Sequence, residues 1–260
     1  MKNFGVRLLA QRQLAIAVAA TLVVALIILG QWTGGSEVRG GTVSLAVGLA
    51  VPFAVLGWLV LTSVPRHPVG RLMTAAGLGG GVYLVAASWP DPLPLAWLSQ
   101  WAWWPSIGLI ILAILLFPDG ALPSPRWRPV GWVIVTGTAI TTITFAVGAL
   151  DQPRTFLTAY EPPLDPWAQV LLLIGLGAGA LAFIGALGAV WSLGSRWRRA
   201  DTDQRRQLAC LLPAAMVFVV GLVLDTLAFD GAWAISAAAI PLGMSVAILR
   251  YRLYDVDLIV

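Results

Sequence analysis

Residues 116–129 read LFPDGALPSPRWRP and separate two segments that are almost wholly apolar. The four prolines of this stretch remove backbone donors and disfavour helix at the residue before each of them, and Asp119-Gly120 favours a turn. No helix is expected to continue through the stretch, so it is interpreted as a loop between two apolar helices. Arg126 and Arg128 precede the second apolar segment, where positive charge indicates the cytoplasmic side of a membrane.

The composition of the whole chain indicates a membrane protein. Of its 260 residues, 59% are hydrophobic and only 11% are charged, and the mean hydropathy is +0.86. A soluble globule of this composition would have too few polar side chains for its surface. Helices satisfy their own backbone groups in lipid, and the alternation typical of barrel strands is absent. We therefore expect an all-α polytopic transmembrane bundle.

Counting apolar runs outward from the central loop predicts about eight spans of roughly 20 residues each, in a single integral membrane domain over residues 1–260. The first run resembles a signal peptide, but it is too long and no small-residue cleavage site follows it, so we expect it to be retained. The predicted spans cover residues 14–30, 42–64, 72–87, 101–117, 130–150, 167–194, 208–229 and 232–249.

The basic residues alternate with these predicted spans. All of the 16 lysine and arginine residues except Arg39 and Arg154 fall on one side of the membrane if the spans are counted in this way. The positive-inside rule therefore predicts that both termini are cytoplasmic. The net charge of +4 belongs to these loops, so the expected environment is a lipid bilayer and no nucleic acid partner is predicted.

Tryptophan is unusually frequent, with 13 copies that lie mostly near predicted span ends. The general interpretation is an aromatic belt at the depth of the lipid headgroups. A more specific hypothesis is that one outer cluster binds an amphipathic or cationic ligand, because aromatic faces attract cations. The residues of this candidate site are Trp89, Asp91, Trp97, Trp101, Trp103 and Trp104.

Asp225 is predicted to lie inside a span, and an intramembrane carboxylate is a functional hypothesis by default. It falls about one turn from the outer end of its span, where water or an arginine such as Arg154 could reach it. The span 130–150 also carries five threonines, most of which are expected to bond the carbonyl one turn back. These polar groups support an alternative function as a small-solute transporter or permease subunit, although no internal repeat or interrupted span favours it.

Glycines occur four residues apart within two predicted spans. Gly77 with Gly81, and Gly175 with Gly179, predict faces of small residues on which neighbouring helices pack closely. The first group lacks the preceding strand and the following lysine of a phosphate-binding loop. Such faces are consistent with a third function, a structural subunit that packs beside a membrane-protein partner or as a homodimer.

The arginine-rich segments after the sixth and eighth predicted spans are expected to contact anionic lipid headgroups or a cytoplasmic output. His67 and Cys210 have no second ligand at metal-binding spacing, and the sequence has no recognisable hydrolase, P-loop or metalloprotease motif. We therefore expect no catalytic residue, no metal and no cofactor. The arginines of the two segments are Arg196, Arg198, Arg199, Arg205, Arg206, Arg250 and Arg252.

Four stretches together carry a resemblance to a known family. They are LFPDGALPSPRWRPVGW at 116–132, HPVGRLM at 67–73, SRWRRADTDQRRQLAC at 195–210 and GMSVAILRYRLYDVDLIV at 243–260. They resemble the N-terminal multi-pass membrane region of sensor histidine kinases from high-GC Gram-positive and related bacteria. The resemblance implies a bacterial cytoplasmic membrane and a signal-input role in a two-component system.

Members of that family usually continue into a phosphoacceptor histidine helix and an ATP-binding domain, and the sequence stops at Val260 without either. We therefore expect a non-catalytic input or scaffold module that is part of a longer kinase, a truncated relative or a stand-alone protein. In the expected mechanism, a ligand or lipid state at the outer aromatic residues favours one of two helix packings. The arginines at 196–206 and the tail at 250–257 would read out that choice.

Overall fold

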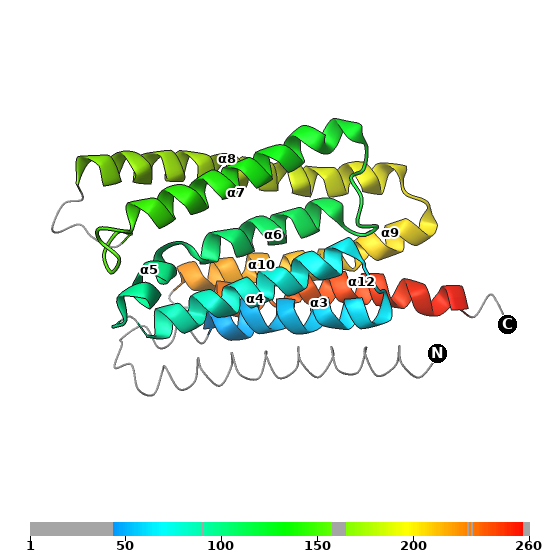
Figure 1. The fold of residues 1–260 in the computed structure, drawn as a ribbon. Helices are drawn as coiled ribbons and strands as arrows, with labels where there is room; N and C mark the ends of the chain where they lie inside the picture. Colours follow the sequence, from blue (N-terminus) through cyan, green and yellow to red (C-terminus); the bar gives the residue numbers. More distant parts are fainter. Residues whose placement is uncertain (1–43, 90, 158–164, 228, 230, 257–260) are drawn as a thin grey trace, which may run out of the picture.

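A computed structural model describes residues 44–89, 91–157, 165–227, 229 and 231–256 of the chain (Figure 1). All regular elements of these residues are helices, which confirms the all-α prediction. The predicted span at 14–30 lies outside the described residues.

Several helices begin with a proline in their first turn, where the missing N–H costs no intrahelical bond. The elements are η1 Ala46–Ala50, α3 Val51–Ser63, α4 Pro68–Ser88, α5 Leu93–Trp101, α6 Trp103–Leu116, η2 Pro125–Trp127, α7 Arg128–Gly148, α8 Pro166–Arg199, α9 Thr202–Ala209, α10 Leu211–Thr226, α11 Ala232–Ser236 and α12 Ala239–Val256.

Six helical segments of the described residues are long and apolar enough to cross a membrane, so the chain is a multi-pass membrane protein by length and composition. The sequence predicted about eight spans, and the described residues contain six. The six segments are Pro68–Ser88, Leu93–Leu116, Pro125–Gly148, Pro166–Arg199, Gln204–Thr226 and Ala232–Arg250.

The predicted span at 42–64 corresponds in the described residues to the shorter apolar helix Gly48–Ser63. At a rise of 1.5 Å per residue this helix is about 24 Å long, less than the roughly 30 Å of the hydrocarbon core. It ends where Pro65 disfavours helical geometry at Val64. Residues 44–47 before it are also helical, the residues before 44 lie outside the described part of the chain, and the helix end at Ser63 agrees with the predicted end at 64 to within one residue.

The span predicted at 101–117 begins eight residues earlier, at Leu93. Pro94 lies in the first turn of α5, where proline is compatible with a helix, rather than in an extended connection. A single turn residue, Ala102, separates α5 from α6. This earlier start places the tryptophans of α5 on a helix rather than in a loop.

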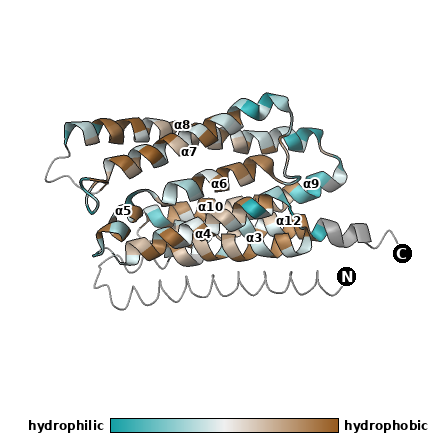
Figure 2. Ribbon diagram, in the orientation of Figure 1, coloured by the Kyte–Doolittle hydropathy of each residue, from teal (hydrophilic) through white to brown (hydrophobic). Residues whose placement is uncertain are grey.

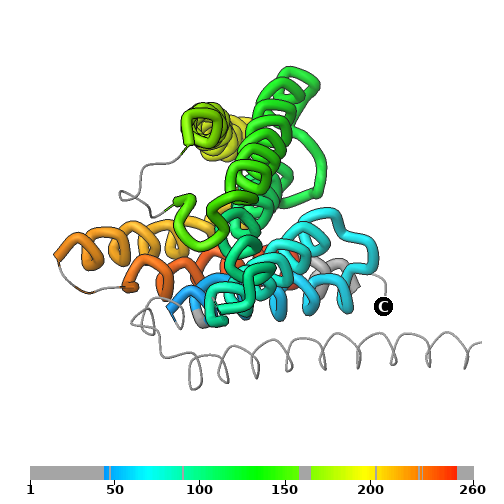
Figure 3. Tube along the Cα trace, turned by 60° about the vertical axis from the view of Figure 1, so that its left-hand side comes forward, coloured from blue at the N-terminus to red at the C-terminus, as the bar shows by residue number. Residues whose placement is uncertain are grey.

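The helices form two groups that α6 joins (Figures 1 and 3). α7 and α8 pack along each other, and α6 contacts both of them. On its other side α6 packs against α4, which is followed in turn by α3, α12 and α10. In Figure 3 the α7 and α8 pair stands apart from the layer that contains α3, α4, α10 and α12. α6 therefore lies between the two groups and contacts both of them.

Apolar residues cover the middle of the helices on the outside of the molecule as well as inside, whereas hydrophilic residues gather at one end of α8 and in α9 (Figure 2). Leu187 and Trp191 on α8 are each 72% exposed, and Met216 on α10 is 68% exposed. Large apolar side chains that are exposed in such numbers are typical of helix surfaces that face lipid.

The connections fall at two opposite ends of the bundle (Figure 1). One end, the basic end, holds the α3–α4, α6–α7 and α8–α9 connections and the last turns of α12. The other, the acidic end, holds the α4–α5, α7–α8 and α10–α11 connections. The described arginines of the basic end are Arg66, Arg71, Arg126, Arg128, Arg196, Arg198, Arg199, Arg205, Arg206 and Arg250, and the acidic end has Asp91, Asp151, Asp165 and Arg154.

Close helix packing at glycines is confirmed at the positions that the sequence indicated. A Cβ on Gly77 would lie 2.6 Å from the carbonyl oxygen of Ala50. A Cβ on Gly179 would lie 2.7 Å from the ring of Trp104. Between α7 and α8, the Thr141 hydroxyl lies 2.9 Å from the carbonyl oxygens of both Gly137 and Gly175. Small residues therefore allow backbone contact between the helices.

Replacement of Gly77 by alanine should destabilise the protein, because the added methyl group has no room against α3. We expect a loss of about 1–3 kcal/mol, the usual cost of overpacking, seen as a lower unfolding temperature in detergent micelles. Gly80→Ala is the matched control, since its Cβ would lie 3.5 Å from Ala50 and alanine is the better helix former. An equal loss in both variants would contradict the assigned contact.

Candidate functional site

Four of the five tryptophans of the predicted ligand site lie together at the acidic end of the bundle. Trp97 and Trp101 on α5 meet edge to face with ring centroids 5.1 Å apart. Trp103 and Trp104, in the first turn of α6, are stacked at 4.6 Å. Trp104 is only 5% exposed, and it contacts Phe145 of α7 at 5.9 Å. We call these four tryptophans, with Phe145 and Phe156, the aromatic cluster.

Polar groups tie the aromatic cluster to the neighbouring connections. The indole N–H of Trp97 donates to the carbonyl of Ala146 at 2.7 Å. The side-chain oxygen of buried Gln100 accepts a hydrogen bond from the backbone N–H of Leu157 at 3.0 Å. Sequence analysis missed Gln100, although a lone amide among tryptophans and leucines was the available signal. These bonds join α5 to the end of α7 and to the loop after it.

The aromatic cluster is built as a packed core, because its rings cover one another. Trp89 is not part of these ring contacts, and its buried indole N–H has no hydrogen-bond partner among the described residues. Asp91 lies nearby in the α4–α5 connection, where its carbonyl oxygen accepts a hydrogen bond from Arg154 at 2.7 Å. The two hollows described below are lined by other residues. A ligand at this cluster therefore stays a prediction.

Asp225 lies at the acidic end, near the last turn of α10. Its carboxylate accepts a hydrogen bond from the backbone N–H of Gly231 at 2.9 Å, and Gly231 has a φ of +84° that favours glycine. Asp225 therefore holds the connection between α10 and α11. The expected approach of Arg154 is not seen, because the Arg154 guanidinium binds Asp91 instead.

At the basic end, Arg196 binds the loop that interrupts the chain between α6 and α7. Its Nη1 lies 3.3 Å from the carboxylate of Asp119, and its Nη2 donates to the carbonyl oxygens of Leu115 and Ala121. The Arg196 side chain is only 11% exposed. We call this arrangement the arginine clasp. It provides a donor for the Leu115 carbonyl in the last turn of α6, where carbonyls lack intrahelical partners, and for the Ala121 carbonyl in the loop.

The α3–α4 turn supports the same loop from the other side. Gly120 has a φ of +75°, and a Cβ there would lie 2.6 Å from Pro68 at the start of α4. The His67 imidazole lies close to the backbone of Pro118 and to Asp119, and its buried Nδ1 has no hydrogen-bond partner among the described residues. Two connections that are distant in the sequence therefore meet at the arginine clasp.

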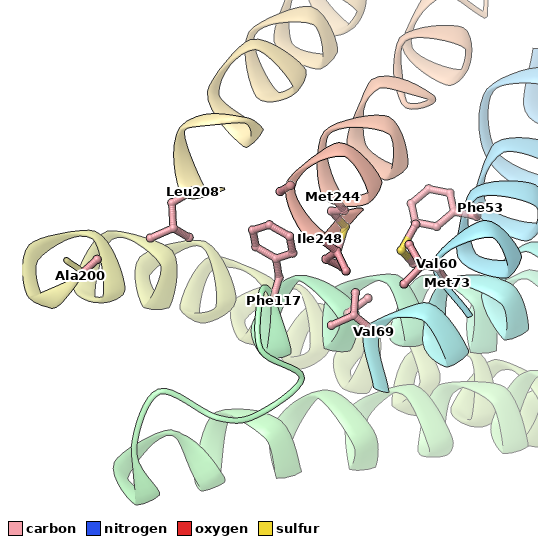
Figure 4. Packing of buried hydrophobic residues seen from close by; sticks show 11 residues of the cluster. Phe53, Val60, Val69, Met73, Phe117, Ala200, Leu208, Met244 and Ile248 are labelled. Atoms are coloured by element: carbon pink, nitrogen blue, oxygen red, sulfur yellow. The ribbon is translucent and has the colours of Figure 1, made fainter. Parts of the chain in front are cut away.

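A hydrophobic cluster lies next to the loop and anchors it (Figure 4). Phe117, which immediately precedes the turn, is fully buried. It packs among side chains from α4, α9 and α12, including Val69, Leu208 and Ile248. The apolar residue of the Phe117-Pro118-Asp119-Gly120 turn thus holds its position while Asp119 faces Arg196.

The predicted group of cytoplasmic arginines is divided by the structure. Arg196 is a structural residue inside the arginine clasp, and its grouping with the lipid-contacting arginines is corrected accordingly. The side chain of Arg252 lies outside the described side chains. The exposed members of the group are Arg198, Arg199, Arg205, Arg206 and Arg250.

Described residues line a hollow at the basic end and a groove on the side of the bundle. The first, of about 240 Å³, lies beside the arginine clasp and has both polar and apolar walls. The second, of about 390 Å³, is an open and almost wholly apolar groove between α6 and α7. The first is lined by Pro118, Asp119, Ala121, Leu122, Pro123, Ser195, Arg196, Arg199, Gln204 and Leu208.

The described residues contain no group of three or more histidine, cysteine, aspartate or glutamate side chains placed to hold a metal ion. No protein-family model, curated protein or solved structure matches the chain.

Replacement of Arg196 by lysine should loosen the clasp although the charge is kept, because an ammonium cannot reach three acceptors with the geometry of a guanidinium. We expect a loss of about 2 kcal/mol in the free energy of unfolding, measured by thermal unfolding in micelles. Arg198→Lys, on an exposed side chain two residues away, is the control and should have little effect. Similar losses in both variants would refute the clasp.

The stability of the basic end should depend on pH through His67. Burial lowers the pKa of His67 below 6.5, and this effect outweighs the opposing effects of Asp119 and the Pro118 backbone. The folded state therefore favours the neutral ring, and protonation favours unfolding. We expect the unfolding temperature to fall as the pH is lowered through 6.5 toward the folded-state pKa. The decrease should be smaller in His67→Gln, and identical pH profiles would contradict this assignment.

Proposed function

We propose that the chain is a non-catalytic membrane module that couples the aromatic cluster at one end of the bundle to the arginine clasp at the other. Its role would be signal input or scaffolding. The observation that carries this proposal is that α6 and α8 each extend from the aromatic cluster to the clasp. A change in ring packing at one end would therefore be transmitted along two continuous helices.

The two helices have matching contacts at both ends. α6 begins with Trp103 and Trp104 in the cluster and ends at Leu115 and Phe117 beside the clasp. α8 has buried Ala168 in the cluster near its start and Arg196 near its end. Rigid helices that share both contact regions are a suitable element for switching between two packings.

The proposed orientation places the basic end in the cytoplasm. The structure supports this by gathering the described arginines other than Arg154 at that end, as the positive-inside rule expects of a cytoplasmic face. The sequence resemblance to the membrane region of sensor histidine kinases supports a bacterial cytoplasmic membrane and a two-component signalling role. Both termini would then be cytoplasmic.

In the proposed mechanism, a ligand or lipid state at the acidic end favours one of two packings of the aromatic cluster. Such a stimulus must bind the two packings with different affinities. The response would appear in the arginine clasp, in α9 and at the basic end of α12. From there it could pass to a kinase domain in a longer protein or to a membrane-protein partner.

The transport alternative gains little support from the positions of the polar groups. Asp225 is engaged in the connection between α10 and α11. The threonine hydroxyls of α7 bond carbonyls one turn back at Thr136, Thr141, Thr142 and Thr144. Their predicted helix-internal bonding is confirmed, and they are largely committed to the helix itself.

Coupling can be tested by hydrogen exchange on the full chain in lipid nanodiscs. Trp104→Phe removes part of the cluster while retaining an aromatic ring. We expect exchange to rise by about threefold or more around residues 115–121 and 195–199, corresponding to a loss of about 0.7 kcal/mol in local opening free energy. The backbone of α10, which is remote from the cluster, should be unchanged.

Trp167→Phe is the matched control, because this tryptophan lies at the same end but is 42% exposed. It should leave exchange at the arginine clasp unchanged. A Trp104→Phe effect confined to residues around the cluster would argue against coupling. A uniform rise in all helices would indicate general destabilisation and would also contradict the proposal.

A further inference from the structure

We propose that the hollow beside the arginine clasp binds a phosphate-bearing group, with Arg199 and Gln204 as its open donors. The hollow lies between the α6–α7 loop, the end of α8 and the start of α9. Its volume of about 240 Å³ is larger than a single phosphate requires and leaves space for the carbon atoms of an ester. This site is independent of the proposed coupling between the ends of the bundle.

The hydrogen-bond donors that line the hollow differ in how many partners they already have. Arg199, the last residue of α8, is exposed and has no ion-pair partner among the described residues. Gln204 uses its backbone N–H to bond Asp201 at 2.8 Å, which leaves its side-chain amide for a ligand. Arg196 forms a third wall, and its buried Nε has no partner in the described structure. Guanidinium and amide donors match phosphate oxygens.

The nearby acidic groups do not neutralise this site fully. Asp119 lines the hollow and is 54% exposed, but its carboxylate is paired with Arg196. The carboxylate of Asp201 accepts the Gln204 backbone N–H and so caps α9. Ser195 has already donated its hydroxyl to the Ser192 carbonyl at 2.8 Å. The charge of Arg199 is therefore the one in the hollow left without a described partner.

The remaining walls suit an ester rather than a bare ion. Leu122, Pro123 and Leu208 give the hollow an apolar side, which would cover the carbon atoms attached to a phosphate. The site lies at the basic end of α8, where a spanning helix leaves the hydrocarbon and meets lipid headgroups. A lipid headgroup phosphate and a soluble phosphate ester share the required chemistry. Either one would link the α6–α7 loop to the end of α8 and to α9.

The test uses the full chain in a maltoside detergent, which contains no phosphate, with binding measured by native mass spectrometry. The probes are dioctanoyl phosphatidic acid, inorganic phosphate and dioctanoylglycerol, which has the same acyl chains without phosphate. We expect phosphatidic acid to bind and dioctanoylglycerol not to bind. In Arg199→Gln the affinity for phosphatidic acid should fall about fivefold, the typical effect of one arginine near an anionic lipid.

Arg198→Gln is the matched control, because it removes an equal charge from the neighbouring residue, which does not line the hollow. Its affinity should change by less than about twofold. Gln204→Leu provides a second variant that keeps all charges and should also weaken binding. Thermal unfolding of each variant separates loss of the site from loss of the fold.

If phosphatidic acid binds and inorganic phosphate does not, the site is assigned to a lipid headgroup. If inorganic phosphate binds comparably, the site is assigned to a soluble phosphate. Either result would support the proposal if Arg199→Gln weakens the binding and Arg198→Gln does not. Equal losses in Arg198→Gln and Arg199→Gln, binding of dioctanoylglycerol as strong as that of phosphatidic acid, or no binding of either phosphate probe would overturn it.

Discussion

A chain that crosses a membrane repeatedly must satisfy its backbone wherever a helix stops, and the arginine clasp meets this requirement at the main interruption of the sequence. The prolines after Leu116 end α6 and leave its last carbonyls without intrahelical partners. Arg196, from a helix eighty residues further along the chain, donates to two of the carbonyls around this loop and pairs with Asp119. That contact joins the end of α8 to the end of α6 and to the α6–α7 loop.

Within the bundle, close approach rather than bulky packing holds the helices together. Lipid is as apolar as a leucine side chain, so helix association depends on van der Waals contact and on hydrogen bonds between helices. Glycines such as Gly77 bring backbones together, and the Thr141 hydroxyl joins α7 to a carbonyl of α8. Larger buried side chains form the aromatic cluster and the cluster that contains Phe117 and also includes Phe53 and Met244 within their helices.

The fold class and six membrane segments could be predicted from the sequence, because run length and hydropathy decide them. The end predicted at residue 64 was also close, because Pro65 stops the described apolar helix at Ser63. The candidate functional site was harder to predict from the sequence. Arg196 and Arg198 look alike in the sequence, and only the return of α8 to the α6–α7 loop separates the buried one from the exposed one. The sequence predicted that the tryptophans lie near one another. It did not predict the ring contact between Trp97 and Trp101, because that contact requires α5 to be a helix.

Because α8 is longer than the hydrocarbon core is thick, its position in the membrane depends on the thickness of the bilayer. Its 34 residues extend about 51 Å at 1.5 Å per residue, against a hydrocarbon core of roughly 30 Å. A helix of this length either tilts or emerges from the bilayer, and the balance shifts with membrane thickness. Because Arg196 lies in the last turn of α8, a thinner bilayer would leave it in water and a thicker one would draw it toward the hydrocarbon. The lipid composition of the membrane thus sets the dielectric environment in which the Arg196–Asp119 pair forms.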